Sequence, residues 1–172
     1  KGSYIASFRQ SFLKHIIKSA GLTSIPEYWN AQIKTVYNIN HRNKLIFNAV
    51  GGRDHIKLED EDRPDLKGAE NVEHTGFQHT EGISLKSLFS EKGYMLISAG
   101  KTTSSWLADV YSKDLDIKDT YFSRDNTEMD RFIKWDVVYK YQKNIEISSG
   151  INVKYGEYDI KEQLDPDTLY FY

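Results

Sequence analysis

The segment IEISSGINVKYG, residues 145–156, alternates apolar and polar side chains one residue at a time. Its odd positions are mostly aliphatic or aromatic, and its even positions carry a carboxylate, an amide, a lysine or a small residue. Successive side chains of a β-strand point to opposite faces of a sheet, so a period of two predicts a strand with two unlike faces.

The same alternation recurs in residues 133–141 and 31–39. In both segments one face is aliphatic and aromatic, while the other carries amides and charges. No buried helix is predicted between these segments. The sequence therefore predicts an all-β protein whose sheet has an apolar face and a polar face.

The predicted strands are separated by connections of two sizes. The short connections are residues 40–43, 90–93 and 143–144, and the long polar ones are residues 18–27, 59–75, 112–130 and 160–167. Because short and long connections alternate, they predict an up-and-down antiparallel meander with short turns at one end. The predicted strands are residues 3–17, 28–39, 44–58, 76–89, 94–111, 131–142 and 145–159, with an eighth beginning near Thr168.

These strands are longer than the five or six residues usual in soluble sheets. Strands of about 9–11 residues or more, with short turns on one side and long loops on the other, are typical of membrane barrels. We therefore expect an antiparallel up-and-down transmembrane β-barrel, with residues 1–172 forming a segment of about seven or eight strands of a larger barrel.

Composition excludes several classes of site. The net charge is -2, with lysines and carboxylates interleaved, so no nucleic-acid partner is expected. There is no cysteine, and hence no disulfide, thiolate metal site or cysteine nucleophile. No run approaches the roughly 18 apolar residues of a membrane helix.

The opening residues carry a resemblance to a known family. GSYIASFRQSFLKHI (residues 2–16), PEYWN (residues 26–30), Gln32, Lys34, YNIN (residues 37–40) and NKL (residues 43–45) resemble the barrel of TonB-dependent outer-membrane receptors. The resemblance covers about the first 55 residues. Two positions depart from the family pattern: Gln10 replaces a second basic residue, and Trp29 with Asn30 follows Pro-x-Tyr in place of an acidic residue.

The resemblance implies a function and a location. Such a receptor takes up a scarce nutrient, which could be siderophore-iron, cobalamin, haem or a glycan, across a bacterial outer membrane. Its partners would be membrane lipid, the small-molecule nutrient and the TonB system, the last through a plug domain that we expect to be absent from these residues. The barrel would be a wall and a filter, so neither catalysis nor a cofactor is expected.

The alternation predicts which way some polar and aromatic side chains face. Five basic residues are predicted to face the lumen and to pair with carboxylates such as Asp136 and Glu146: Arg9, Lys34, Lys44, Lys134 and Lys140. Five aromatic residues suit interfacial girdles: Trp29, Trp135, Tyr139, Tyr141 and Tyr155. Ligand contacts are expected in residues 18–27, 59–75 and 112–130, with no individual side chain assigned.

The histidines and one pair of adjacent glycines are the remaining candidates. The five histidines are scattered (His15, His41, His55, His74 and His79), and His74 and His79, an odd number of residues apart, are predicted on opposite faces, which argues against a shared metal. Gly51 and Gly52 predict a bend or bulge where a strand passes into a loop.

Two other classes stay open. The first is a complete small barrel acting as an adhesin or a lipid-modifying enzyme. The second is a soluble β-sheet binding module, in which another layer would cover the apolar face.

Overall fold

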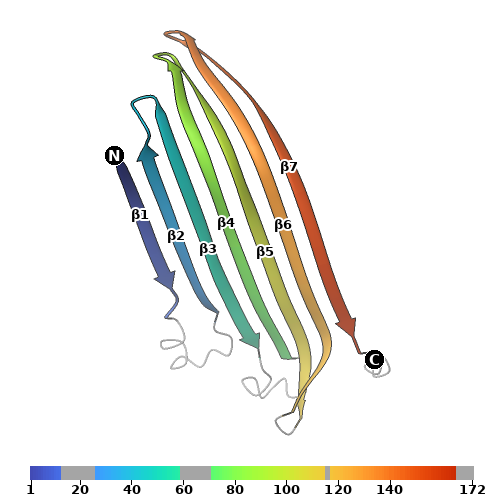
Figure 1. Ribbon diagram of the computed structural model, residues 1–172. Coiled ribbons are helices and arrows are strands. Elements are labelled where there is room, and N and C mark those ends of the chain that lie inside the picture. Colours follow the sequence, from blue (N-terminus) through green and yellow to red (C-terminus); the bar gives the residue numbers. More distant parts are fainter. Residues whose placement is uncertain (13–25, 59–70, 115–116, 166–172) are drawn as a thin grey trace.

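The computed structural model describes residues 1–12, 26–58, 71–114 and 117–165, and in this part every regular element is a β-strand (Figure 1). The strands are β1 (Gly2–Gln10), β2 (Glu27–Asn38), β3 (Asn43–Leu58), β4 (Asn71–Ser90), β5 (Gly93–Asp114), β6 (Ile117–Gln142) and β7 (Ile145–Leu164). They form one antiparallel sheet in sequence order, which confirms the predicted meander. The sheet is not closed, with β1 and β7 at its edges, and is consistent with a barrel segment.

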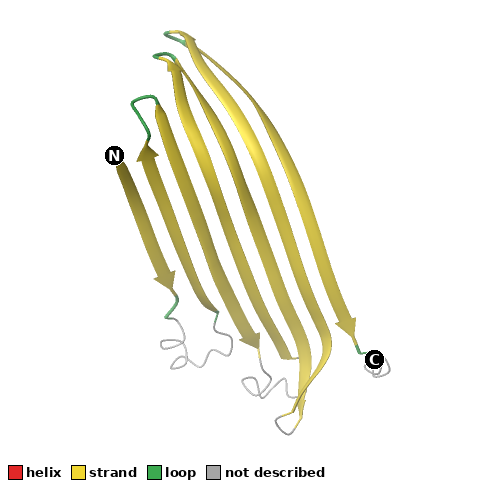
Figure 2. Cartoon of the chain, in the orientation of Figure 1, coloured by secondary structure: helices red, strands yellow, loops and turns green. Residues whose placement is uncertain are grey.

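Three tight turns join strands at one end of the sheet, as predicted (Figure 2). Between β2 and β3, Asn40 Oδ1 accepts hydrogen bonds of 2.9 Å from the backbone N–H groups of both Arg42 and Asn43. This side chain replaces backbone partners in the turn, which is why asparagine is favoured there. Between β4 and β5, the Lys92 N–H donates to Ser90 Oγ at 3.1 Å.

Successive hairpins are staggered along the strand direction (Figure 1). Asn43 at the start of β3 pairs with Ser87, and β4 continues three residues further to Ser90. Gly93 at the start of β5 pairs with Tyr139, and β6 likewise continues three residues to Gln142. A constant offset of this kind is the shear that accompanies tilted strands in barrels.

The strand register places the alternating side chains on two faces. One face carries most of the large apolar side chains, and we call it the apolar face. Its large apolar residues include Tyr4, Phe8, Trp29, Ile33, Tyr37, Leu45, Phe47, Phe77, Ile83, Leu85, Ile97, Ile133, Trp135, Ile151, Val153 and Tyr155. The opposite face is called the polar face and carries Ser7, Lys34, Asn48, Gln78, Thr80, Thr102, Lys134 and Asn152, with interspersed apolar residues such as Val50 and Phe132. The predicted division into two unlike faces is confirmed.

Neither face is covered within the described residues. The one buried large apolar side chain there is Tyr111, whereas Ile133, Ile151 and Val153 are more than 60% exposed. A soluble domain of this length buries an extensive apolar core. The described sheet therefore stands as a single layer, with its apolar residues on the surface.

Four strands extend beyond their predicted limits at the end opposite the tight turns. Residues 112–130, predicted as a loop, lie almost entirely in β5 and β6, so that prediction was wrong. Likewise β4 begins at Asn71, inside the predicted 59–75 loop, and β7 runs on to Leu164. Both faces of these extensions carry polar residues, as in Ser123-Arg124-Asp125-Asn126, so they lack the alternation that marks a half-buried strand.

Other boundaries also differ. The first strand, predicted to run to residue 17, ends at Gln10. Residues 13–17 of that prediction, and the strand expected near Thr168, lie outside the described part. Gly51 and Gly52 lie inside β3, where the pairing is regular, so the predicted bend or bulge was wrong. A Cβ on Gly52 would lie 2.7 Å from the Trp29 carbonyl oxygen, and this close approach is the physical reason for glycine there.

Candidate ligand-binding faces

Large apolar residues of the apolar face form a band between the tight turns and a charged border. On four neighbouring strands the border consists of Glu81, Lys101, Arg131 and Glu157. Lys101 Nζ lies 3.9 Å from Glu81 Oε1, and Arg131 Nη1 lies 2.9 Å from Glu157 Oε1. We call the region between this border and the turns the apolar band.

The band continues further on the N-terminal strands. On β2 it runs from Tyr37 to Trp29, and on β3 it ends at Arg53, which pairs directly with Trp29. The border is therefore stepped: Glu81, Lys101 and Arg131 are direct neighbours on β4, β5 and β6, whereas Arg53 on β3 pairs with Phe77, four residues beyond Glu81.

The predicted girdle residues fall at different depths. Trp29 and Tyr155 lie beside the charged border, and Tyr139 lies near the turn end of β6, as girdles at two interfaces would require. Trp135 lies further inside the band, opposite Ile97, so the register does not place it in a girdle. Tyr141 lies at the irregularity between Lys140 and Gln142 and is exposed.

All five basic residues predicted to face the lumen lie on the polar face. Lys134 Nζ is 3.0 Å from Asp136 Oδ2, which confirms the predicted pairing for this lysine. Glu146, the other predicted carboxylate, lies directly opposite Lys140 in the register. Neighbouring hydroxyl groups also pair across the strands of this face, with 3.0 Å between Thr80 and Thr102 and 2.8 Å between Ser84 and Ser98.

The polar face contains a candidate binding site that sequence reasoning missed. Tyr28, Asp54, Gly76 and Trp106 are direct neighbours on β2, β3, β4 and β5. The adjacent row is Asn30, Gly52, Gln78 and Ser104. Two adjoining hollows of about 400 and 370 Å³ are lined by these residues and by His74. We call the two hollows together the polar-face hollow.

Two glycines lie in the floor of this hollow. A Cβ on Gly76 would lie 2.6 Å from Asp54 Oδ1, in the position between Asp54 and Trp106. Gly52 lies next to Asp54 on the same face of β3, where the backbone of β2 approaches closely. The absence of a Cβ at Gly76 therefore makes room for the Asp54 carboxylate, which lies over the floor of the hollow between Tyr28 on one side and Trp106 on the other.

The side chains around this floor can bind a polar ligand. Asp54 Oδ2 lies 3.7 Å from His74 Nε2, and the Trp106 indole N–H donates to Ser104 Oγ at 3.0 Å. Carboxylate, imidazole and amide groups can exchange hydrogen bonds with hydroxyl or ammonium groups, while aromatic rings provide stacking surfaces. No pattern within a single strand marks this site, because its residues are brought together only by the pairing of four strands.

A hydroxyl–imidazole–carboxylate chain lies on the apolar face outside the band. His55 Nδ1 is 2.9 Å from Thr75 Oγ1, and His55 Nε2 is 3.9 Å from Glu73 Oε1. The order resembles that of a nucleophile, base and acid. However, Thr75 lies inside β4, whose backbone pairs with both β3 and β5, so the local N–H groups point into the ladders rather than at a substrate oxyanion. We interpret the contacts of Thr75, His55 and Glu73 as a cross-strand polar cluster.

The other predicted candidates are separated or lie outside the described part. His74 lies on the polar face and His79 on the apolar face, which confirms the prediction that they point apart. Within the described ranges, no group of three or more His, Asp or Glu residues gathers as a metal site. Residues 18–25 and 59–70 of the expected ligand-binding loops lie outside those ranges.

Comparison with known proteins does not place the chain in a family. No protein-family model matches it, and no curated protein matches it significantly. Among the described residues, no helix has the length and hydrophobicity needed to cross a bilayer.

Proposed function

We propose that this chain forms part of the wall of a nutrient importer of the TonB-dependent receptor class in a bacterial outer membrane. The observation that carries the proposal is the apolar band on a single-layered, staggered sheet. Along β2 the band spans Trp29 to Tyr37, and along β7 it spans Ile147 to Tyr155. Each span matches the roughly 9–11 residues that a tilted strand needs to cross a bilayer.

The orientation follows from the connections. Membrane barrels have short turns on the periplasmic side and long loops outside. We therefore assign the three tight turns to the periplasmic side and the charged border to the outer interface. The two edges, β1 and β7, would pair with further strands, because hydrocarbon does not tolerate unpaired backbone groups.

The polar face would line the lumen, and the polar-face hollow is our candidate contact for the imported solute. It lies level with Trp29 and Arg53, so it would face the lumen at the outer end of the band. The resemblance of residues 2–45 supports the receptor class. By that resemblance, a plug domain coupled to TonB would gate passage, and this part of the barrel would guide the solute without chemical change.

Ligand binding by the full protein tests this proposal. The purified protein in detergent is titrated with a ferric siderophore, cobalamin, haem and an oligosaccharide, and binding is measured by calorimetry. Asp54→Asn and Trp106→Ala are expected to weaken binding of one of these solutes by about tenfold or more, since each removes a charge-assisted bond or a stacking surface.

Glu81→Gln on the apolar face is the matched control and is expected to leave binding unchanged. Cells that are first starved of the bound solute and then supplied with it should accumulate the solute only while TonB is present. Accumulation that continues without TonB, or equal effects of the Asp54 and Glu81 substitutions, would contradict the assignment.

A further inference from the structure

Two adjoining hollows on the apolar face share the side chain of Trp29. One has a volume of about 630 Å³ and a mostly apolar lining, which includes Phe8, Ala31, Ala49 and Phe77, with His79 and Glu81 among its polar residues. The other has a volume of about 320 Å³ and a mixed lining, in which Gln10, Glu27 and Arg53 are polar and Phe12 is apolar. We call them the apolar hollow and the head-group hollow.

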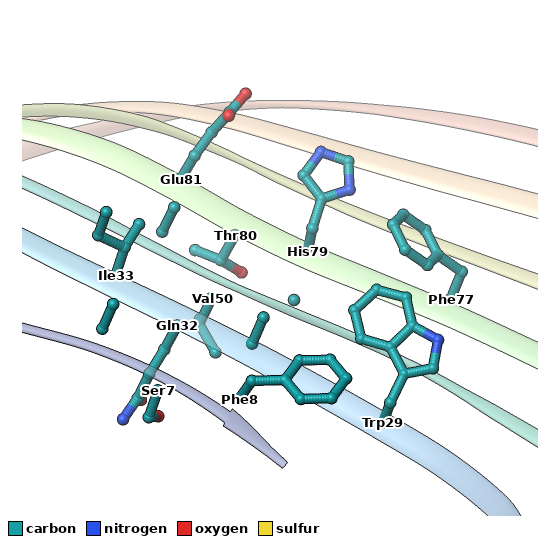
Figure 3. Close-up of a pocket in the computed structure, with 14 residues that line it drawn as sticks. Ser7, Phe8, Trp29, Gln32, Ile33, Val50, Phe77, His79, Thr80 and Glu81 are labelled. Carbon is teal, nitrogen blue, oxygen red and sulfur yellow. The ribbon is translucent and has the colours of Figure 1, made fainter. Parts of the chain in front are cut away.

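The apolar hollow exists because small residues lie between large ones. Ala31 is flanked across the strands by Phe8 and Gly51, and Ala49 lies next to Gly51 on the same face. Figure 3 shows Phe8 beside Trp29, with Phe77 on the far side of the hollow. The Phe8 and Trp29 rings are stacked, with centroids 6.1 Å apart. The depression is thus open along the band and walled by aromatic rings toward the border.

The head-group hollow places a cation at the end of this depression. Gln10, Trp29, Arg53 and Phe77 are direct neighbours on β1, β2, β3 and β4. Arg53 therefore lies between two aromatic residues, Trp29 and Phe77, at the edge of the apolar band. Arginine binds phosphate with two parallel hydrogen bonds, and tryptophan favours the level of lipid head groups.

We infer that the two hollows together form a binding site for one phosphate-bearing membrane lipid. Its phosphate would bind Arg53, with the Gln10 amide as a second donor, and one acyl chain would lie in the apolar hollow. The guanidinium of Arg53 selects this occupant. Among the described residues Arg53 forms no ion pair, although Glu27 also lines the head-group hollow, so a purely apolar molecule would leave the guanidinium without a ligand. The inference rests on the proposed contact of the apolar face with lipid, and it adds a specific site to that general contact.

Native mass spectrometry of the full protein in detergent tests the inference. The probe is phosphatidylglycerol, with diacylglycerol of the same chains as the phosphate-free comparison. The wild-type protein is expected to retain phosphatidylglycerol in preference to diacylglycerol. Arg53→Gln should lower the affinity for phosphatidylglycerol by about tenfold or more, whereas Arg131→Gln, at the same border on β6, should leave it unchanged.

A second pair of variants tests the apolar hollow. Ala31→Leu adds bulk inside it, and Ala99→Leu adds the same bulk to the band between Ile83 and Ile133. Only Ala31→Leu is expected to reduce lipid retention. Equal retention of the two lipids, or equal loss in the Arg53 and Arg131 variants, would overturn the inference.

The failure of this site can be distinguished from the failure of the proposed function. A protein that remains embedded in membranes but shows no lipid preference refutes only the lipid site. A protein that is monodisperse in plain buffer without detergent refutes the membrane-wall proposal, and the lipid site with it.

Discussion

A lysine at the middle of the apolar band should destabilise the protein far more than a lysine one residue away on the other face. Ile33 lies four residues from Trp29 and four from Tyr37, the two ends of the band on β2. At about 3.3 Å per residue, each end is about 13 Å away along the strand, or about 9 Å in depth for a tilt of about 45°. Ile33 would therefore lie near the centre of the bilayer.

Ile33→Lys is expected to lower the free energy of unfolding by about 2–4 kcal/mol, the cost of a lipid-facing lysine at the midplane of a barrel. Gln32 lies on the polar face, opposite Ser7 and Val50, and Gln32→Lys should change the free energy of unfolding by less than about 0.5 kcal/mol. Urea unfolding of the full protein in lipid vesicles measures both. As a depth control, lysine at Trp29 should cost only about 0–1 kcal/mol through its charge.

Varying the thickness of the bilayer distinguishes contact with lipid from burial in a protein core. In vesicles of shorter-chain lipid, the midplane lies closer to water, so the cost of Ile33→Lys should fall. A lysine buried in a protein core would cost the same in both lipids. Equal destabilisation by Ile33→Lys and Gln32→Lys, or a cost independent of bilayer thickness, would refute the reasoning.

Two further substitutions test the packing and the border. Gly52→Ala should destabilise the sheet by about 1–3 kcal/mol, because the added Cβ would lie 2.7 Å from the Trp29 carbonyl oxygen. Gly82→Ala should destabilise it less, because the nearest atom to its added Cβ is 3.3 Å away. The midpoints of urea unfolding compare the two variants. Arg131→Gln removes the 2.9 Å ion pair between Arg131 and Glu157, two side chains that are each about half exposed. It should lower the free energy of unfolding by about 0.2–1 kcal/mol in low salt, and by less at high ionic strength. A Gly82 variant as unstable as the Gly52 variant, or an Arg131 effect that grows with salt, would contradict these expectations.

The extent to which the sequence predicts this fold depends on the environment of each strand. Residues 133–155 were assigned correctly because one face is apolar and the other polar, so the side-chain period is visible. Residues 117–130 were missed because both faces of that extension carry polar residues, as at Asp125 and Asn126. Pairing with β5 and β7 holds this segment in a strand, and such pairing leaves no mark in the local sequence.

The same limit applies to the candidate sites. Alternation alone placed Lys34 and Lys134 on the polar face, because that assignment needs only the direction of a side chain. The polar-face hollow needs Asp54, Gly76 and Trp106 to be opposite one another, and that depends on the register of three strands. The glycines were misread for a related reason: a bend and a close approach of two strands both require glycine, and only the paired structure distinguishes them.

The most direct test of the central claim is the accessibility of spin labels along β6. The chain has no cysteine, so a single cysteine at each position from 132 to 138 labels one site of this segment at a time. In vesicles, labels at Ile133, Trp135 and Val137 should collide mainly with dissolved oxygen, and those at Lys134 and Asp136 mainly with a water-soluble nickel complex. Odd positions shielded from both reagents would show that protein covers the apolar face and would contradict a wall in contact with lipid.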